Sequence, residues 1–192
     1  SGLHALCALR LGAAEVVAMD IDPDSVRTAQ RVLSQRVPEL KWRVIEKSVF
    51  DVTRNELGQF DLVYSWGVLH HTGDMQRAIR CAADLVRPGG RLVIALYRKT
   101  RLCSFWKIEK KWYAAAGERA QRAARAVYVW LFKINLWRRG NEFGSFRNFT
   151  ANYKNNNRGM DFFHDVHDWM GGWPYESTSP ADVDAMLTPL GF

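Results

Sequence analysis

Residues 60–97 read FDLVYSWGVLHHTGDMQRAIRCAADLVRPGGRLVIALY, and this stretch decides the fold. Apolar and β-branched residues over 60–66 and again over 91–97 predict two strands. Between them, residues 74–86 have the apolar period of a helix, which we expect to stop at Arg87-Pro88-Gly89-Gly90. A strand, a helix and a second strand in this order indicate two parallel strands joined by a right-handed crossover.

The residues before this unit repeat the same alternation of elements. Helix formers fill residues 3–11, and a short apolar strand is predicted over 15–21. A helix capped by Asp24 or Ser25 and a strand over 41–49 follow. This alternation predicts the α/β class with a doubly wound, mainly parallel sheet.

A long amphipathic segment follows the last predicted strand. Apolar residues recur every three or four positions over 101–138, which predicts one long helix or a helix pair broken near Gly117. Residues 98–147 hold 13 Lys and Arg against 3 Asp and Glu, whereas the rest of the chain holds 14 against 17. The predicted division is a partial core over 1–97, a basic helical insertion over 98–150, and a substrate-side loop with the last helix over 151–192.

Length and composition restrict the class of protein. With 192 residues, 47% of them hydrophobic, the chain can bury one sizeable core, and we expect a single domain. No stretch approaches the roughly 20 apolar residues that span a bilayer, no signal peptide is visible, and the three cysteines are far apart. We therefore expect a cytoplasmic protein. Tryptophans and basic residues over 101–138 also allow peripheral membrane contact, with a lid over a pocket as the alternative.

Acidic residues follow the strand predicted over 15–21. In open α/β sheets, ligands bind beyond the carboxyl ends of the strands. Asp20 lies 18 residues after Gly2, near the usual separation between a glycine-rich loop and a ribose-binding carboxylate. Capping the next helix is an equally plain role for Asp20 or Asp22. Spacing alone therefore leaves ribose binding and helix capping open.

Four segments occur in an order and at a spacing that are typical of one enzyme family. They are Ser1-Gly2-Leu3, residues 17–22 (VAMDID), residues 60–72 (FDLVYSWGVLHHT) and residues 85–94 (LVRPGGRLVI). These segments resemble the motifs of class I S-adenosylmethionine-dependent methyltransferases, of the small-molecule, methyltransferase-11-like type. The resemblance implies a Rossmann-like fold that lacks its first strand and C-terminal hairpin and carries an inserted helical lid. Because that first strand lies centrally in the family's sheet, its absence puts cofactor binding by this chain alone in question.

The resemblance also implies the cofactor, S-adenosyl-L-methionine, and the residues that would bind it. Apart from the glycine that precedes the first helix, all of them end or follow predicted strands. They are Gly2 at the amino acid end, Asp20 at the ribose, Ile21, Ser48 and Val49 at the adenine, and Trp66 and Gly67 at the methionine end.

Histidines are the candidates for chemistry. Methyl transfer from a sulfonium chiefly requires alignment of donor and acceptor, but an oxygen acceptor must also lose a proton. Histidine, with an unperturbed pKa near ~6.5, suits that step. The candidates are His71, which with His70 follows a predicted strand, and the pair His164 and His167. No second ligand cluster accompanies that pair, so no metal site is predicted, and packing within a loop is their alternative role.

The favoured function is methyl transfer to a small molecule, at an oxygen of a hydrophobic or quinone-like compound. Residues 158–176 resemble a segment from a branch with quinone- or lipid-linked chemistry. RNA methylation is an alternative because of the basic segment, although no RNA-binding module is recognisable and nucleic acid is not the expected partner. A second alternative is a non-catalytic nucleotide-binding or membrane-associated interaction domain. A nicotinamide dehydrogenase would explain Gly2 and Asp20 but not the segments after residue 60. The oligomeric state is left open.

Overall fold

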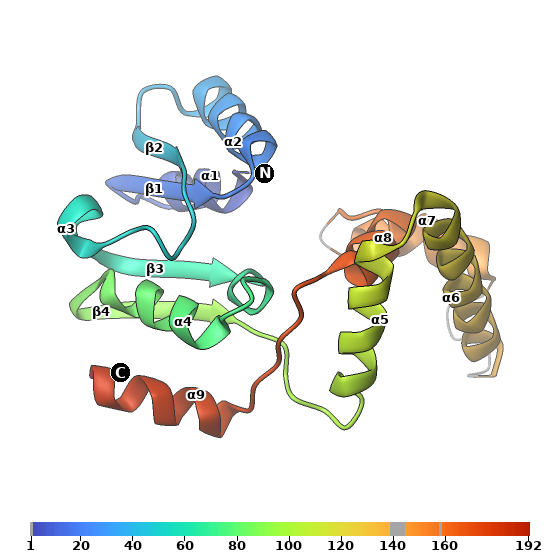
Figure 1. Ribbon diagram of the computed structural model, residues 1–192. Coiled ribbons are helices and arrows are strands. Elements are labelled where there is room, and N and C mark those ends of the chain that lie inside the picture. Colours follow the sequence, from blue (N-terminus) through green and yellow to red (C-terminus); the bar gives the residue numbers. More distant parts are fainter. Residues whose placement is uncertain (1, 139–144, 158) are drawn as a thin grey trace. The chain divides into compact units, whose positions relative to one another are not determined.

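The chain forms two compact units (Figure 1). One comprises residues 1–64 and 76–93, and the other comprises residues 65–75 and 94–192. The computed structural model describes residues 2–138, 145–157 and 159–192. Ser1 of the glycine motif and residues 139–144 of the predicted insertion lie outside the described residues.

The first unit is built on a parallel strand pair, β1 (Glu15–Asp20) and β2 (Lys41–Glu46). Asp20 pairs with Glu46, so the two strands end level with each other at their carboxyl ends. Lys47 continues this contact, because its backbone N–H donates to the Asp20 carbonyl over 3.0 Å. Residues that follow either strand are therefore neighbours at one edge.

Helices α1 (Leu3–Arg10) and α2 (Pro23–Arg36) pack on this strand pair through their apolar faces. Trp42 of β2 is partly buried and packs against this core, and its Nε1 donates to the Val37 carbonyl over 3.1 Å. Burial of these side chains holds the unit together. The buried core residues are Ala5, Leu6, Leu9, Leu33 and Val37.

Asp22 caps helix α2. Its carboxylate accepts from the backbone N–H of Asp24 over 3.2 Å and of Ser25 over 2.9 Å, and Pro23 occupies the first helical turn. Hydrogen bonds from Ser25 and then Asp24 lower the pKa of Asp22. The predicted cap at Asp24 or Ser25 is wrong, because Asp22 caps the helix. The other acid considered for this role, Asp20, is the last residue of β1.

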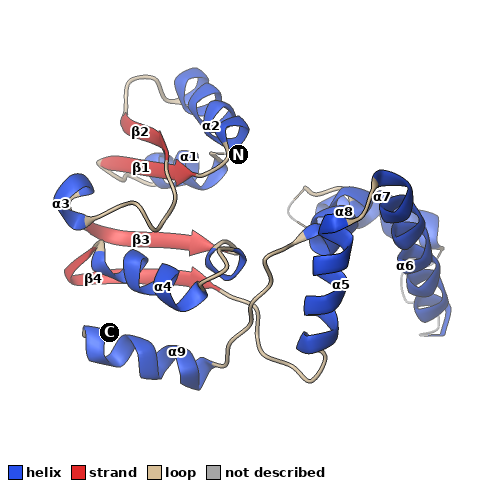
Figure 2. Cartoon of the chain, viewed as in Figure 1, coloured by secondary structure: helices blue, strands red, loops and turns tan. Residues whose placement is uncertain are grey.

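A second strand pair consists of β3 (Phe60–Trp66) and β4 (Val86–Ala95), connected through α4 (Met75–Asp84) and preceded by α3 (Arg54–Leu57). Its two strands run in the same direction (Figure 2). The α/β class is confirmed, and the strand and helix order fits a Rossmann-like methyltransferase fold. Among the described residues, however, the strands form two separate two-stranded sheets rather than one sheet.

Strand β4 begins earlier than predicted and includes residues 87–90, where we expected a break. Gly90 lies close to β3, because a Cβ there would lie 3.1 Å from the Asp61 carbonyl oxygen. A glycine lets the backbone of β4 approach β3 this closely. Arg87 and Asp61 form an ion pair of 2.5 Å between the same strands.

The second unit contains the predicted insertion as two helices, α5 (Cys103–Ala115) and α6 (Glu118–Arg138). Of the two alternatives, the helix pair broken near Gly117 is confirmed. No helix within the described residues is both long and apolar enough to cross a membrane.

Two further helices, α7 (Phe146–Asn156) and α8 (Phe162–Gly171), replace most of the loop that we expected after residue 151. Both carry a side-chain cap, because the side chain of Ser145 accepts from Asn148 N and that of Asp161 accepts from Phe163 N. The loop prediction is therefore wrong for these residues. The buried centre of this helical core consists of Tyr113, Phe162, Val166 and Met170.

The segment after α8 returns to the short 3-10 helix η1 (Leu69–His71) and to the residues that follow β4. Glu176 N donates to the His70 carbonyl over 3.0 Å, and the Glu176 carboxylate accepts from Met75 N over 2.8 Å. Thr178 N donates to the Tyr97 carbonyl over 3.0 Å. These bonds hold residues 174–178 against η1, before the chain enters α9 (Pro180–Leu187) and the final turn η2 (Thr188–Leu190).

Candidate functional site

Asp20 is the best placed of the predicted cofactor residues. It is the exposed last residue of β1, and its Oδ1 accepts from Asp22 N over 3.1 Å. No described residue donates a hydrogen bond to Oδ2. Since Asp22 supplies the helix cap, the Asp20 carboxylate is available for a ligand hydroxyl.

Ile21, Ser48 and Val49 lie near Asp20 because β1 and β2 end level. Ile21 is 71% exposed, an unusual position for an isoleucine, and it directly follows Asp20. Ser48 and Val49 are half-buried in the turn after β2, where Ser48 Oγ accepts from Phe50 N over 3.2 Å. This edge therefore combines one carboxylate, one hydroxyl and apolar surface, which suits a nucleoside.

Gly2 precedes α1 with a φ of +73°, in the left-handed region. A Cβ at this position would lie 2.9 Å from Cα of Ala29 on α2. Glycine is thus required by the close approach of α1 and α2. This packing role exists alongside the predicted contact with a cofactor.

Trp66 is the last residue of β3 and Gly67 follows it, and both belong to the second unit. Gly67 has a φ of +75°, and its N–H donates to the Ala95 carbonyl over 3.1 Å. Trp66 is about half exposed. The structure therefore brings Asp20, Ser48 and their neighbours together in the first unit, and it places Trp66 and Gly67 beside each other in the second.

His71 has the geometry of a general base. Its Nδ1 lies 2.7 Å from the Pro174 carbonyl oxygen, which only accepts, so Nδ1 carries the proton. The ring is half-buried, lies edge-on to Tyr97 at 5.4 Å, and is so close to Gly172 that a Cβ there would lie 2.9 Å from His71 Cε1. The neutral ring is thereby fixed with its lone pair on Nε2, the arrangement that a base requires.

His70 is a different kind of histidine. Its side chain is buried, and both ring nitrogens lack a hydrogen-bond partner among the described residues. Burial, followed by the neighbouring His71, lowers the pKa of His70 to about 4, and the nearby Ala95 carbonyl opposes this shift only in part. The ring is therefore neutral near neutral pH and packs against Tyr97 with ring centroids 4.0 Å apart.

This burial predicts a pH dependence of stability. The folded pKa of about 4 lies below the ordinary 6.5, so at acidic pH the unfolded chain binds a proton that the folded chain excludes. Stability should therefore be complete above pH 6.5 and fall as the pH drops toward 4, by up to roughly 3 kcal/mol. Urea unfolding at several pH values measures this loss, which His70→Leu should flatten and the exposed control His164→Leu should leave unchanged. Parallel pH curves for the wild type and His70→Leu would contradict the assignment.

His167 is arranged less well for catalysis. Its Nδ1 lies 2.7 Å from Tyr113 Oη and 2.9 Å from Arg125 Nη1, and Arg125 also donates to Tyr113 Oη over 2.6 Å. Because arginine has only donors, Nδ1 of His167 must accept, and the proton lies on Nε2. Its lone pair is occupied, so His167 joins α5, α6 and α8 rather than serving as a base.

His164 lies on the outer side of α8. Its side chain is 88% exposed, and its Nδ1 is 4.0 Å from Asp161 Oδ1. Among the described residues, no group of three or more His, Cys, Asp or Glu side chains could hold a metal ion. Of the three predicted catalytic histidines, only His71 combines a fixed ring with an available lone pair.

Comparisons with known proteins add the family. A model of the methyltransferase domain matches residues 2–92. This match agrees with the resemblance of these residues to methyltransferases. The chain is also similar to ubiquinone biosynthesis O-methyltransferases of Xanthomonas axonopodis pv. citri, Xanthomonas euvesicatoria pv. vesicatoria and Xanthomonas oryzae pv. oryzae, each 33% identical over 99 residues. This match covers 52% of the chain, and the chain spans 40% of the length of these relatives.

The residues that fix the His71 ring lie after residue 92, where the match to the methyltransferase domain ends. They were not identified from the sequence. Tyr97 lies two residues after the end of β4, and this position near a strand end was a usable signal. The Pro174 carbonyl lies 103 residues along the chain from His71, and no sequence pattern connects the two.

Proposed function

We propose that this chain binds S-adenosyl-L-methionine and serves methyl transfer to an oxygen of a small hydrophobic, quinone-like acceptor. The match to the methyltransferase family supports the reaction class. The single geometric observation that carries the choice of an oxygen acceptor is His71, whose Nδ1 is bound by the Pro174 carbonyl while Nε2 keeps its lone pair. A hydroxyl acceptor has a proton to lose, and His71 can take it.

The residues present fit the proposed cofactor. Asp20 offers Oδ2 to a ribose hydroxyl, and Ile21 offers exposed apolar surface to an adenine ring beside Ser48 and Val49. Gly2, Trp66 and Gly67 are assigned to the amino acid and methionine parts by family resemblance. The bound cofactor would supply an electrophilic methyl group, so the chain's own residues have only to bind, orient and remove a proton.

The proposed acceptor class rests on the relatives. They are named as O-methyltransferases of ubiquinone biosynthesis, and they share about a third of their residues with the matched part of this chain. We extend that chemistry to this protein as far as a hydrophobic ring that bears a hydroxyl group.

Asp20→Ala tests the cofactor proposal. We expect micromolar binding of S-adenosylmethionine to the wild-type protein, and a loss of about 10-fold, or ~1.4 kcal/mol, in the variant. Isothermal titration calorimetry with S-adenosylmethionine and S-adenosylhomocysteine measures both. Asp24→Ala is the matched control, because Asp24 is an exposed carboxylate on the same turn whose side chain pairs with Arg27.

Equal affinity of the wild type and Asp20→Ala would contradict the assigned ribose contact. A folded wild type that binds neither compound would refute the methyltransferase proposal and favour a non-catalytic domain.

A further inference from the structure

Helix α5 carries an apolar stripe that no described part of the chain covers. Its members, at positions i, i+3, i+6 and i+10, lie on one face of the helix. Each of them is more than half exposed, although large apolar side chains normally pack inside. They are Leu102, Phe105, Ile108 and Trp112.

Basic residues border this stripe. Lys107 and Lys111 are exposed and lie one turn apart. Glu109 is the single acid in the sequence of α5, and both of its carboxylate oxygens are buried. The exposed face of α5 therefore combines apolar side chains with positive charge and presents no carboxylate oxygen.

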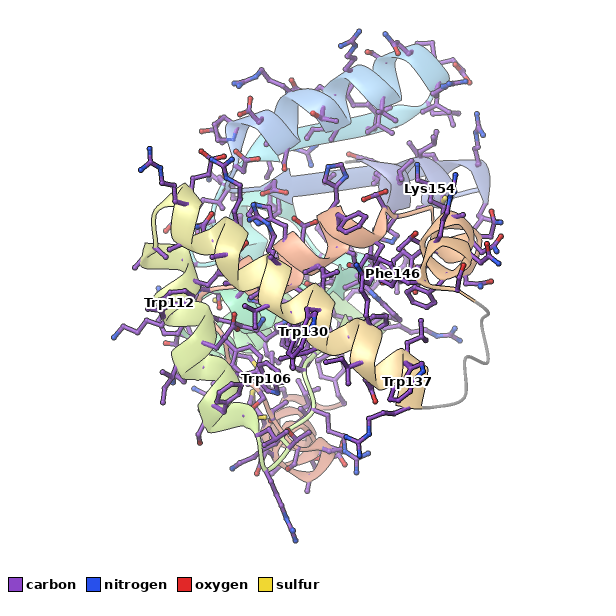
Figure 3. The ribbon with its side chains drawn as sticks, turned by 90° about the vertical axis from the view of Figure 1, so that its right-hand side faces the viewer. Trp106, Trp112, Trp130, Trp137, Phe146 and Lys154 are labelled. Atoms are coloured by element: carbon purple, nitrogen blue, oxygen red, sulfur yellow. The ribbon has the colours of Figure 1, made fainter. Side chains whose placement is uncertain are left out.

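Helix α6 shows the same combination and does not cover the stripe. Val127, Trp130, Leu131 and Trp137 are also more than half exposed. Its single acid, Glu118, already pairs with Arg122 at 3.4 Å. Figure 3 shows Trp112 on α5 and Trp130 and Trp137 along α6.

We propose that the α5 stripe docks this protein on an anionic lipid bilayer, with Phe105, Ile108 and Trp112 at the headgroup level. A helix that binds in the plane of a membrane surface needs an apolar face and basic neighbours, and tryptophan favours the interface between water and hydrocarbon. Lys107 and Lys111, one turn apart on one side of that face, lie where they can reach lipid phosphates. The inference stands apart from the proposed methyl transfer, since it depends only on the surface of α5.

The charges argue against other occupants of the stripe. In a symmetric dimer the same face meets itself, which would bring the lysines of one copy near those of the other without a carboxylate between them. An RNA strand would satisfy the lysines but would leave Ile108, which is 72% exposed, in water. A bilayer satisfies the charge and the apolar surface together.

Vesicle sedimentation tests the proposal with the 192-residue chain. We expect binding to an equimolar mixture of phosphatidylcholine and phosphatidylglycerol, weaker binding at high salt, and little binding to phosphatidylcholine alone. Lys107→Glu with Lys111→Glu should weaken partitioning about 30-fold or more. Arg10→Glu with Arg36→Glu makes the same change in net charge on exposed arginines of the first unit and should have far less effect.

The apolar contribution has its own matched pair of variants. Ile108→Ser with Trp112→Ser should reduce partitioning about 10-fold or more, whereas Leu3→Ser with Leu11→Ser, which are exposed on α1 and at its end, should not. All substituted side chains are exposed, so circular dichroism and thermal midpoints should match the wild type. Equal partitioning of test and control variants would overturn the proposal. So would RNA binding without vesicle binding, or a concentration-dependent dimer that Trp112→Ser dissociates.

Discussion

His71→Asn should lower kcat for methylation of an oxygen acceptor about 100-fold or more while leaving the affinity for S-adenosylmethionine unchanged. Asparagine keeps an N–H where the imidazole has Nδ1, so the hydrogen bond to the Pro174 carbonyl can persist. Asparagine has no basic lone pair at the position that Nε2 occupies in histidine. As the acceptor oxygen gains the methyl group, its proton would no longer have the imidazole as an acceptor.

The separate effects on kcat and KM distinguish this role from a structural one. Loss of a base should lower kcat and leave KM for the acceptor nearly unchanged, whereas a displaced η1 should change both. His164→Asn and His167→Asn are the controls, because one side chain is solvated and the other has its Nδ1 lone pair bound by Tyr113 and Arg125. A variant at position 71 that keeps the wild-type kcat would remove His71 from the reaction.

The first unit was largely predictable from the sequence because its signals are local. Strand β1, the acid at its end and helix α2 follow each other directly, so position along the chain determines position in space. The cap was assigned two or three residues too late, because the nearby Asp22, Asp24 and Ser25 are all good capping residues. Only the hydrogen bonds of Asp22 separate its role from that of Asp20.

The histidines could not be ranked from the sequence. His71 and His167 differ through the Pro174 carbonyl and the Arg125 guanidinium, which lie 103 and 42 residues away along the chain. The first partner leaves a lone pair available and the second occupies it. Contacts of this range depend on how η1, α6, α8 and the returning segment pack, and no local pattern specifies them.

The helices after residue 145 were missed for a different reason. Their aromatic residues do not face a sheet but pack against one another, and this gives no simple amphipathic period to read. The caps at Ser145 and Asp161 are identified only by their hydrogen bonds in the structure. Tertiary packing therefore outweighs local preference in this part of the chain.

Phe162→Ala should destabilise the helical unit by about 3–5 kcal/mol, the range for removal of a large buried aromatic side chain. Phe162 is 3% exposed and lies at the centre of an aromatic cluster, so its loss leaves a cavity that five rings border. Those rings have centroids 5.2–5.7 Å from that of Phe162 and belong to Phe132, Phe146, Phe149, Tyr153 and Phe163.

The adjacent residue is a matched control, because Phe163 is the same residue type on the same helix but is 52% exposed. Phe163→Ala should cost less than about 1 kcal/mol, as expected for a surface position. Urea unfolding measures both as shifts of the midpoint at constant slope. Equal losses for the two variants would mean that Phe162 does not organise the core. A large loss for Phe162 alone would show that this one side chain holds α6, α7 and α8 together, and with them the surroundings of His167.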